Sequence, residues 1–85
     1  MIREIEKNDR NYCINYTVYN QLGKSCKISV GDLINCSLIS GDSEIIYVGR
    51  VSDVYPEKNE FSLYNFEHRI LQRIPCSIMD SIAVL

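Results

Sequence analysis

The sequence contains no tryptophan, a single histidine, only two prolines and no long apolar run. Because no continuous apolar stretch reaches the length of a membrane span, the sequence predicts neither a transmembrane segment nor a signal peptide. Residues 1–10 instead alternate charged and apolar side chains. We therefore expect a cytosolic protein with reduced thiols and no membrane partner.

Closely spaced metal ligands are also missing. The cysteines at positions 13, 26, 36 and 76 are far apart in the sequence, and His68 is the one histidine. Zinc sites normally include at least one close ligand pair, so we expect no metal and no other cofactor. A Cys76 nucleophile served by His68 is an alternative, but it lacks an evident residue to orient the histidine. We expect buried structural thiols and no enzymatic activity.

An excess of positive charge is absent as well. Nine lysines and arginines against eleven aspartates and glutamates give a formal net charge of −2. Nonspecific binding to nucleic acid needs a broad basic surface, so this charge balance disfavours it. A local site for a nucleotide, or for RNA held by a ring of subunits, stays open because such sites use a few loop residues.

What the sequence does contain is a strongly alternating apolar pattern. Its 85 residues, 46% of them hydrophobic, are enough for one globular domain. The alternation predicts an all-β fold, with an N-terminal β-hairpin over residues 12–30 and a small, strongly bent β-barrel over residues 33–85. Residues 1–10 fit either a short strand or one helical turn.

The period of two also assigns inward faces. We expect Ile34, Cys36 and Leu38 to point into the core, with Asn35 and Ser37 pointing outward. In the hairpin before them, one face is predicted to hold Cys26, Ile28 and Val30. The cysteines thus fall on apolar faces, in agreement with structural thiols.

The best-specified hairpin is Tyr47–Leu63. A strand over residues 44–55 is longer than usual and must bend, and its valines do not keep a strict period of two after Gly49. We predict bulges at Gly49 and at Ser52-Asp53, which would let one strand belong to both halves of a barrel. Asn59 closes the turn, and the strand that follows has two apolar residues, Phe61 and Leu63, on one face.

Residues 30–85 resemble the small barrels of the Sm-like and Src-homology-3-like families. In the first Sm motif, a glycine opens the bent strand, apolar residues follow, and an asparagine closes the turn before a strand that ends in leucine. The Src-homology-3-like group has a proline-led helical turn before the last strand. The residues that match the first Sm motif are Gly49, Val51, Val54, Asn59 and Leu63. The residues that match the proline-led turn are Ile74-Pro75-Cys76-Ser77-Ile78.

The sequence departs from the Sm pattern at three places. Tyr55 stands where the family has an acidic residue, Leu63 comes one position late, and the arginine-glycine pair of the second Sm motif is absent. What the resemblance implies is a barrel whose terminal strands pair between subunits, with loops carrying Asn59 and Arg73 as the places where RNA bases or a small nucleotide would bind.

Five residues are candidates for contact with a ligand or partner. Tyr55 and Asn59 lie at the predicted hairpin tip, where an aromatic ring can also simply pack over its own turn. A locally basic segment that can bind phosphate or carboxylate, or can be a solvated connection, holds His68, Arg69 and Arg73. Structural roles are predicted for Gly49, at the bend, and Pro75, before the last strand.

These features predict a non-enzymatic protein-interaction or regulatory module. The apolar residues 82–85 form an uncapped last strand, which favours self-association into a homo-oligomer. One alternative is an Sm-like ring that binds RNA bases or a small nucleotide through its loops. A second alternative is a small inhibitor of a larger protein, of phage or mobile-element origin.

Overall fold

The computed structural model describes residues 3–7 and 12–85, and its side chains are described from residue 14 onward. The described part of the chain is all-β, as the alternating pattern predicts, and contains no α-helix. Its strands are β1 (Arg3–Lys7), β2 (Tyr12–Tyr19), β3 (Ser25–Ile28), β4 (Leu33–Ser40), β5 (Ser43–Tyr55), β6 (Glu60–Asn65), β7 (Ile70–Pro75) and β8 (Met79–Val84), and its two 3-10 turns are η1 (Pro56–Lys58) and η2 (Cys76–Ile78).

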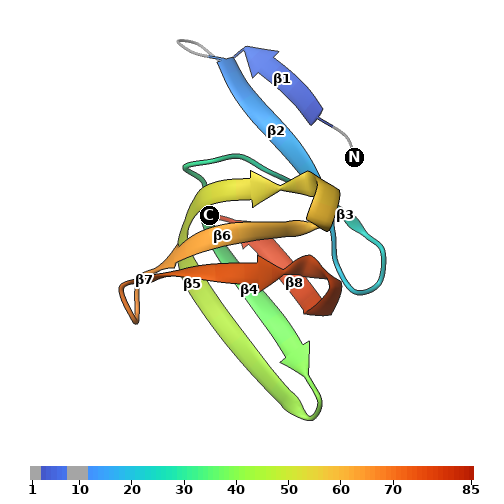
Figure 1. Ribbon diagram of the computed structural model, residues 1–85, viewed down its shortest axis with the longest axis vertical. Helices are drawn as coiled ribbons and strands as arrows, with labels where there is room; N and C mark the ends of the chain where they lie inside the picture. The colour runs from blue at the N-terminus through green and yellow to red at the C-terminus, as the bar shows by residue number, and fades with distance from the viewer. Residues whose placement is uncertain (1–2, 8–11) are drawn as a thin grey trace.

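The strands form two antiparallel sheets (Figure 1). The first follows the order β1-β2-β3 and contains the predicted N-terminal hairpin as β2 and β3. The second follows the order β7-β6-β5-β4-β8, so the last strand returns to lie beside β4. The expected barrel is present only as a strongly bent, open sheet, because no ladder joins β7 to β8 in the described residues.

Residues 1–10, which the sequence left open between strand and helical turn, include β1 in their described portion, 3–7. Residues 1–2 and 8–10 lie outside the described residues.

The long strand β5 connects the two halves of the five-stranded sheet. Its first part pairs with β4 as far as Arg50, and its second part pairs with β6 from Gly49 onward. In Figure 1 the strand rises from the hairpin at the bottom of the view and curves over toward β6. The register shifts between Val51 and Asp53, which confirms the bulge predicted at Ser52-Asp53.

The second predicted bulge, at Gly49, is wrong. Gly49 pairs in regular register with Ile34 on one side and Asn65 on the other. The glycine is needed for a different reason: a Cβ atom there would overlap the carbonyl oxygen of Tyr64 and lie 2.8 Å from its carbonyl carbon. Gly49 therefore permits the close approach of β6 to β5 at the bend.

The core lies on the inner face of the bent sheet. The expectation for Ile34, Cys36 and Leu38 is confirmed, since all three are buried, but Ser37, expected to face outward, is buried as well. Val30 does not lie on the buried face with Ile28, because β3 ends at Ile28 and the next residues turn. The buried apolar side chains are Val18, Ile28, Ile34, Cys36, Leu38, Val51, Val54, Phe61, Leu63, Ile74, Cys76 and Met79.

Backbone hydrogen bonds attach the N-terminal sheet to this core. The turn after β2 donates from the Gln21 N–H to the Met79 carbonyl over 2.8 Å. After β3, Gly31 donates to the carbonyl of Val51, and the N–H of Val51 donates to the carbonyl of Asp32. The residues around the bulge in β5 are therefore bonded to the N-terminal segment as well as to β6.

Pro75 has the structural position that the sequence predicts. It is the last residue of β7, and the 3-10 turn η2 follows directly. Since β7 is an edge strand of the sheet, a residue without an N–H group is tolerated there.

Candidate functional site

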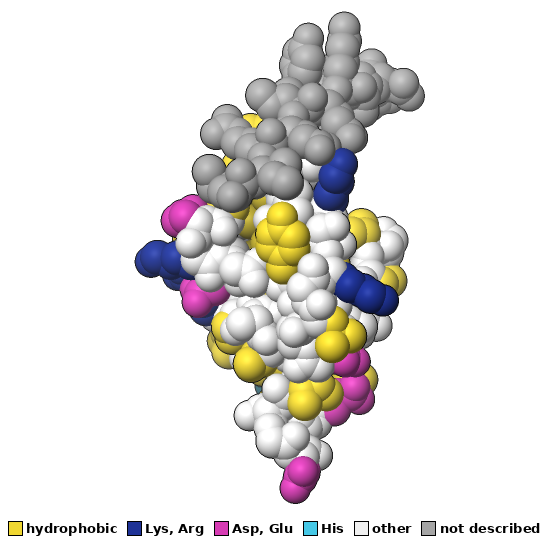
Figure 2. Space-filling view, turned by 90° about the vertical axis from the view of Figure 1, so that its right-hand side faces the viewer, with side chains coloured by type: hydrophobic (Ala, Val, Ile, Leu, Met, Phe, Trp, Pro, Cys, Tyr) yellow, Lys and Arg dark blue, Asp and Glu magenta, His cyan; other side chains and the backbone are white. Residues whose placement is uncertain are grey.

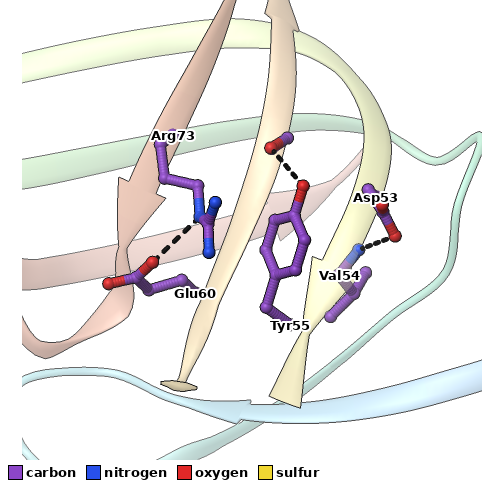
Figure 3. Close-up of polar contacts among 6 residues, drawn as sticks. Asp53, Val54, Tyr55, Glu60 and Arg73 are labelled. Carbon is purple, nitrogen blue, oxygen red and sulfur yellow. Dashed lines mark hydrogen bonds and ion pairs between the residues drawn. The ribbon is translucent and has the colours of Figure 1, made fainter. Parts of the chain in front are cut away.

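An arginine stacks on a tyrosine on the outer face of β5, β6 and β7 (Figure 3). The guanidinium carbon of Arg73 lies 3.6 Å from the centre of the Tyr55 ring. The Nε atom of Arg73 lies 2.9 Å from a carboxylate oxygen of Glu60, and the Tyr55 hydroxyl is 3.2 Å from the hydroxyl of Ser62. We call these four residues the Arg73–Tyr55 cluster.

Strand register explains why these four side chains meet. Glu60 is opposite Tyr55, and Ser62 is opposite Arg73, so alternating residues of β6 place both pairs on one face. Two of the five candidate residues, Tyr55 and Arg73, are thus brought together from separate strands.

The positive charge of the Arg73–Tyr55 cluster is already balanced by a residue of this chain. The charge of Arg73 is already paired with Glu60, and its guanidinium plane is held by the ring of Tyr55. Its side chain is still 44% exposed. Arginine and tyrosine in a fixed, half-exposed arrangement are typical of residues that contribute most to protein interfaces.

Asn59 has a structural use that the sequence did not reveal. It adopts a left-handed conformation, with φ of 53°, directly after η1. Its side-chain oxygen accepts a 2.8 Å hydrogen bond from the N–H of Tyr19, and its side-chain nitrogen donates over 2.9 Å to the carbonyl of the same residue. The amide group therefore bonds the end of β2 as a neighbouring strand would, and its polar groups are occupied by this chain.

The basic segment does not form one cluster. His68 and Arg69 lie in the turn between β6 and β7, beyond Asn65, whereas Arg73 lies near the other end of β7, opposite Ser62. Arg69 has a positive φ of 57° and donates from its N–H to the Asn65 carbonyl over 2.7 Å. The segment thus supplies two exposed turn residues and one separate arginine.

Figure 2 shows that the basic side chains are also scattered on the side of the molecule that it views. The lysine and arginine side chains there lie apart from one another, with acidic side chains between some of them. Among the described side chains, this view has no continuous basic stripe of the kind that follows a nucleic-acid backbone.

Asn65 is an organising residue that the sequence interpretation missed. It is 1% exposed, and its side-chain oxygen accepts hydrogen bonds from the N–H groups of Glu67 and His68. Its side-chain nitrogen donates to Gln72, which in turn donates to the hydroxyl of Tyr47. The sequence did hold one sign of this role: Asn65 is a polar residue at an inward-facing position of its strand, two positions after the buried Leu63.

The described cysteines are free, and two are fully buried. Burial raises the pKa of the Cys76 thiol to about 12, with smaller contributions from Cys36, Cys26 and Glu60. Burial likewise raises the pKa of Cys36 to about 11 and raises that of Cys26. The thiols of Cys36 and Cys76 are therefore protonated at neutral pH, which is the unreactive form.

Thiol labelling should follow this burial. In a Cys13→Ser background at neutral pH, we expect iodoacetamide to leave Cys36 and Cys76 unmodified in the folded protein and to modify both after unfolding in urea. The shift from 9.0 to about 12 alone makes the Cys76 thiolate about a thousandfold scarcer. Peptide mass spectrometry would measure each site, and rapid native labelling of Cys76 would support a nucleophile instead.

In the part of the chain that the structure describes, no three side chains of histidine, cysteine, aspartate or glutamate are arranged to hold a metal ion. That same part includes no helix with the length and hydropathy of a membrane span. No family model, curated protein or solved structure matches the chain.

Proposed function

We propose that this chain is a cytosolic, non-enzymatic protein-interaction or regulatory module that self-associates, and that its fold is a small barrel of the Sm-like or Src-homology-3-like type. Three features of the five-stranded sheet support the barrel. The strand β5 is long and bent, a 3-10 turn separates β7 from β8, and β8 returns to pair with β4. The N-terminal sheet adds Val18 and Ile28 to the same core.

The observation that carries self-association is the apolar character of the two sheet edges. In the described residues, β7 and β8 are the outer strands of the five-stranded sheet, and each has a neighbour on one side only. Val84 on β8 is 54% exposed, and Ile70 and Leu71 on β7 are 51% and 65% exposed. An apolar edge with unpaired backbone groups favours pairing with another chain.

An interaction function also agrees with the Arg73–Tyr55 cluster. Its arginine is held in place and half exposed, so a partner that covers it loses little side-chain freedom. The same contacts weigh against a ring that reads RNA bases, since the Asn59 amide is bonded to Tyr19 and the charge of Arg73 is paired with Glu60.

Light scattering after size exclusion tests the proposal. We expect a mass above that of the 9.8 kDa monomer at micromolar concentration, and a lower mass for Val84→Lys, which places a charge on the β8 edge. Circular dichroism should show that this variant keeps its β structure, because the side chain is exposed. A wild-type protein that stays monomeric over the whole concentration range would contradict self-association.

A further inference from the structure

A contiguous apolar patch lies on the outer face of the five-stranded sheet, opposite the core. Its residues come from β5, β6 and β7 and from the first position of the turn after β6. Their exposed fractions run from 38% to 65%, far above those of core residues. We call this surface the outer patch; it consists of Ile46, Val48, Tyr64, Phe66 and Leu71.

Strand register shows that the outer patch is continuous. Tyr64 is opposite Leu71 on β7, and the N–H of Phe66 donates to the carbonyl of Val48 on β5 over 3.1 Å. The rings of Tyr64 and Phe66 are 6.1 Å apart and meet edge to face. Ile46 precedes Val48 by two positions, so both side chains lie on one face of the strand.

The outward side of β5 carries a charge pattern centred on this patch. The alternate residues Glu44, Ile46, Val48 and Arg50 are all exposed and follow the order acidic, apolar, apolar, basic. A two-fold axis that crosses the strand between Ile46 and Val48 reverses this order. Two copies stacked with their β5 strands antiparallel would therefore place each Glu44 near the other copy's Arg50, and each Ile46 near the other copy's Val48.

The size of the outer patch agrees with this occupant. Its five half-exposed apolar side chains present on the order of 500 Å², near the upper end for a monomer surface and a large part of the roughly 800 Å² that each partner contributes to a stable interface. Two sheets can pack face to face through their exposed side chains, which is the arrangement that a second copy would give.

We propose that the outer patch is the contact between two copies of this chain, related by a two-fold axis perpendicular to β5 and flanked by two Glu44 to Arg50 ion pairs. This inference rests on the proposed self-association and names a second surface for it, the outer face of the sheet, which shares only Leu71 with the β7 edge. Arg50 is already oriented, since one guanidinium nitrogen donates to the carbonyl of Gly31 over 2.7 Å. Its remaining donors are available to a carboxylate from the second copy.

A charge exchange between two variants tests the two-fold geometry. Glu44→Arg alone brings two basic residues together at each contact, and Arg50→Glu alone brings two acidic residues together. Each variant should dimerise at least about tenfold more weakly than the wild type, since like charges at an interface repel. When the two variants are mixed, one contact joins the two substituted residues and the other joins the native Glu44 and Arg50; both pairs are of opposite charge, so the mixed dimer should recover the affinity of the wild type.

Sedimentation of labelled samples at low and high salt would measure these affinities. Glu57→Arg and Lys58→Glu provide matched controls, because they make the same charge changes at exposed positions on η1, away from the outer patch. These controls should associate as the wild type does, alone and mixed. Because Arg50 also bonds to Gly31, thermal unfolding should confirm that Arg50→Glu is folded at the temperature used.

Apolar substitutions separate this inference from the proposed function. Val48→Glu should weaken the face contact and leave edge pairing intact, whereas Val84→Lys should do the reverse. Suppose that the wild type associates, that Val48→Glu associates equally well, and that mixing Glu44→Arg with Arg50→Glu does not restore the affinity. The outer patch is then not the contact between copies, although self-association stands. If the wild type is monomeric throughout, both proposals fall.

Discussion

Replacing Gly49 with alanine is expected to lower the free energy of unfolding by about 3 kcal/mol, the upper end for adding a methyl group to a packed site. The added Cβ would overlap the carbonyl oxygen of Tyr64 and come within 3.0 Å of the Leu63 side chain. The closest obstacle is backbone, so a change of rotamer cannot remove it. Gly49 is bonded into ladders on both sides, and β5 can move only if one ladder breaks.

Urea unfolding monitored by circular dichroism would measure this loss. Gly23→Ala is the matched control, because Gly23 has a positive φ of 77° but no atom within 4 Å of the added Cβ. The control should lose about 1 kcal/mol from backbone strain alone. If both variants lost the same free energy of unfolding, the close approach of β6 to β5 would not be what constrains Gly49.

The same position shows how far the sequence could lead. Gly49 in a run of alternating valines was enough to predict a bend in a long strand, and the inward positions of Ile34, Cys36 and Leu38 followed from the period of two. The kind of constraint at Gly49 was not accessible, because it depends on how near the backbone of Tyr64 passes. Local pattern identifies strands, whereas the distance between strands is a property of the folded sheet.

The candidate site shows the same limit: the sequence identified single residues, and the folded sheet decides which of them meet. Tyr55 was suspected from its place at a predicted hairpin tip and Arg73 from the locally basic segment, but their stacking requires the register that sets Glu60 opposite Tyr55 and Ser62 opposite Arg73. The turn residues His68 and Arg69 were grouped with Arg73 by sequence distance, and the length of β7 separates them. Nearness along a chain is a poor guide in a sheet, where neighbouring side chains come from different strands.

The outer patch and the sheet edges differ in the assemblies that they would build. Pairing of one copy's β7 edge with another's β8 edge joins unlike surfaces, which produces rings or open chains. Contact through the outer patch joins like surfaces and stops at two copies. A protein that used both would form pairs of rings or crosslinked chains, so the masses of Val48→Glu and Val84→Lys would reveal the symmetry of each contact.

Replacing Asn59 should detach β2 from the β5–β6 hairpin. The Asn59 side chain makes two hydrogen bonds to the backbone of Tyr19, each contributing about 1 kcal/mol. Asn59→Gly keeps the left-handed backbone accessible and loses only these bonds, so we expect a loss of about 2 kcal/mol in the free energy of unfolding. Asn59→Ala also adds the strain of a positive φ and should lose about 3 kcal/mol.

Asn59→Asp tests the donated bond, because aspartate retains an oxygen to accept from the N–H of Tyr19 but turns its second carboxylate oxygen toward the Tyr19 carbonyl oxygen, where the two acceptors repel. Its loss should therefore be at least that of Asn59→Gly, about 2 kcal/mol. Hydrogen exchange at the Tyr19 amide offers a local measurement, and exchange should accelerate strongly in both variants. If Asn59→Gly unfolded at the same urea concentration as the wild type, with the Tyr19 amide still protected, the bonds from Asn59 would not be what holds β2 against the hairpin. Asn59 would then again be available as the ligand contact that the sequence suggested.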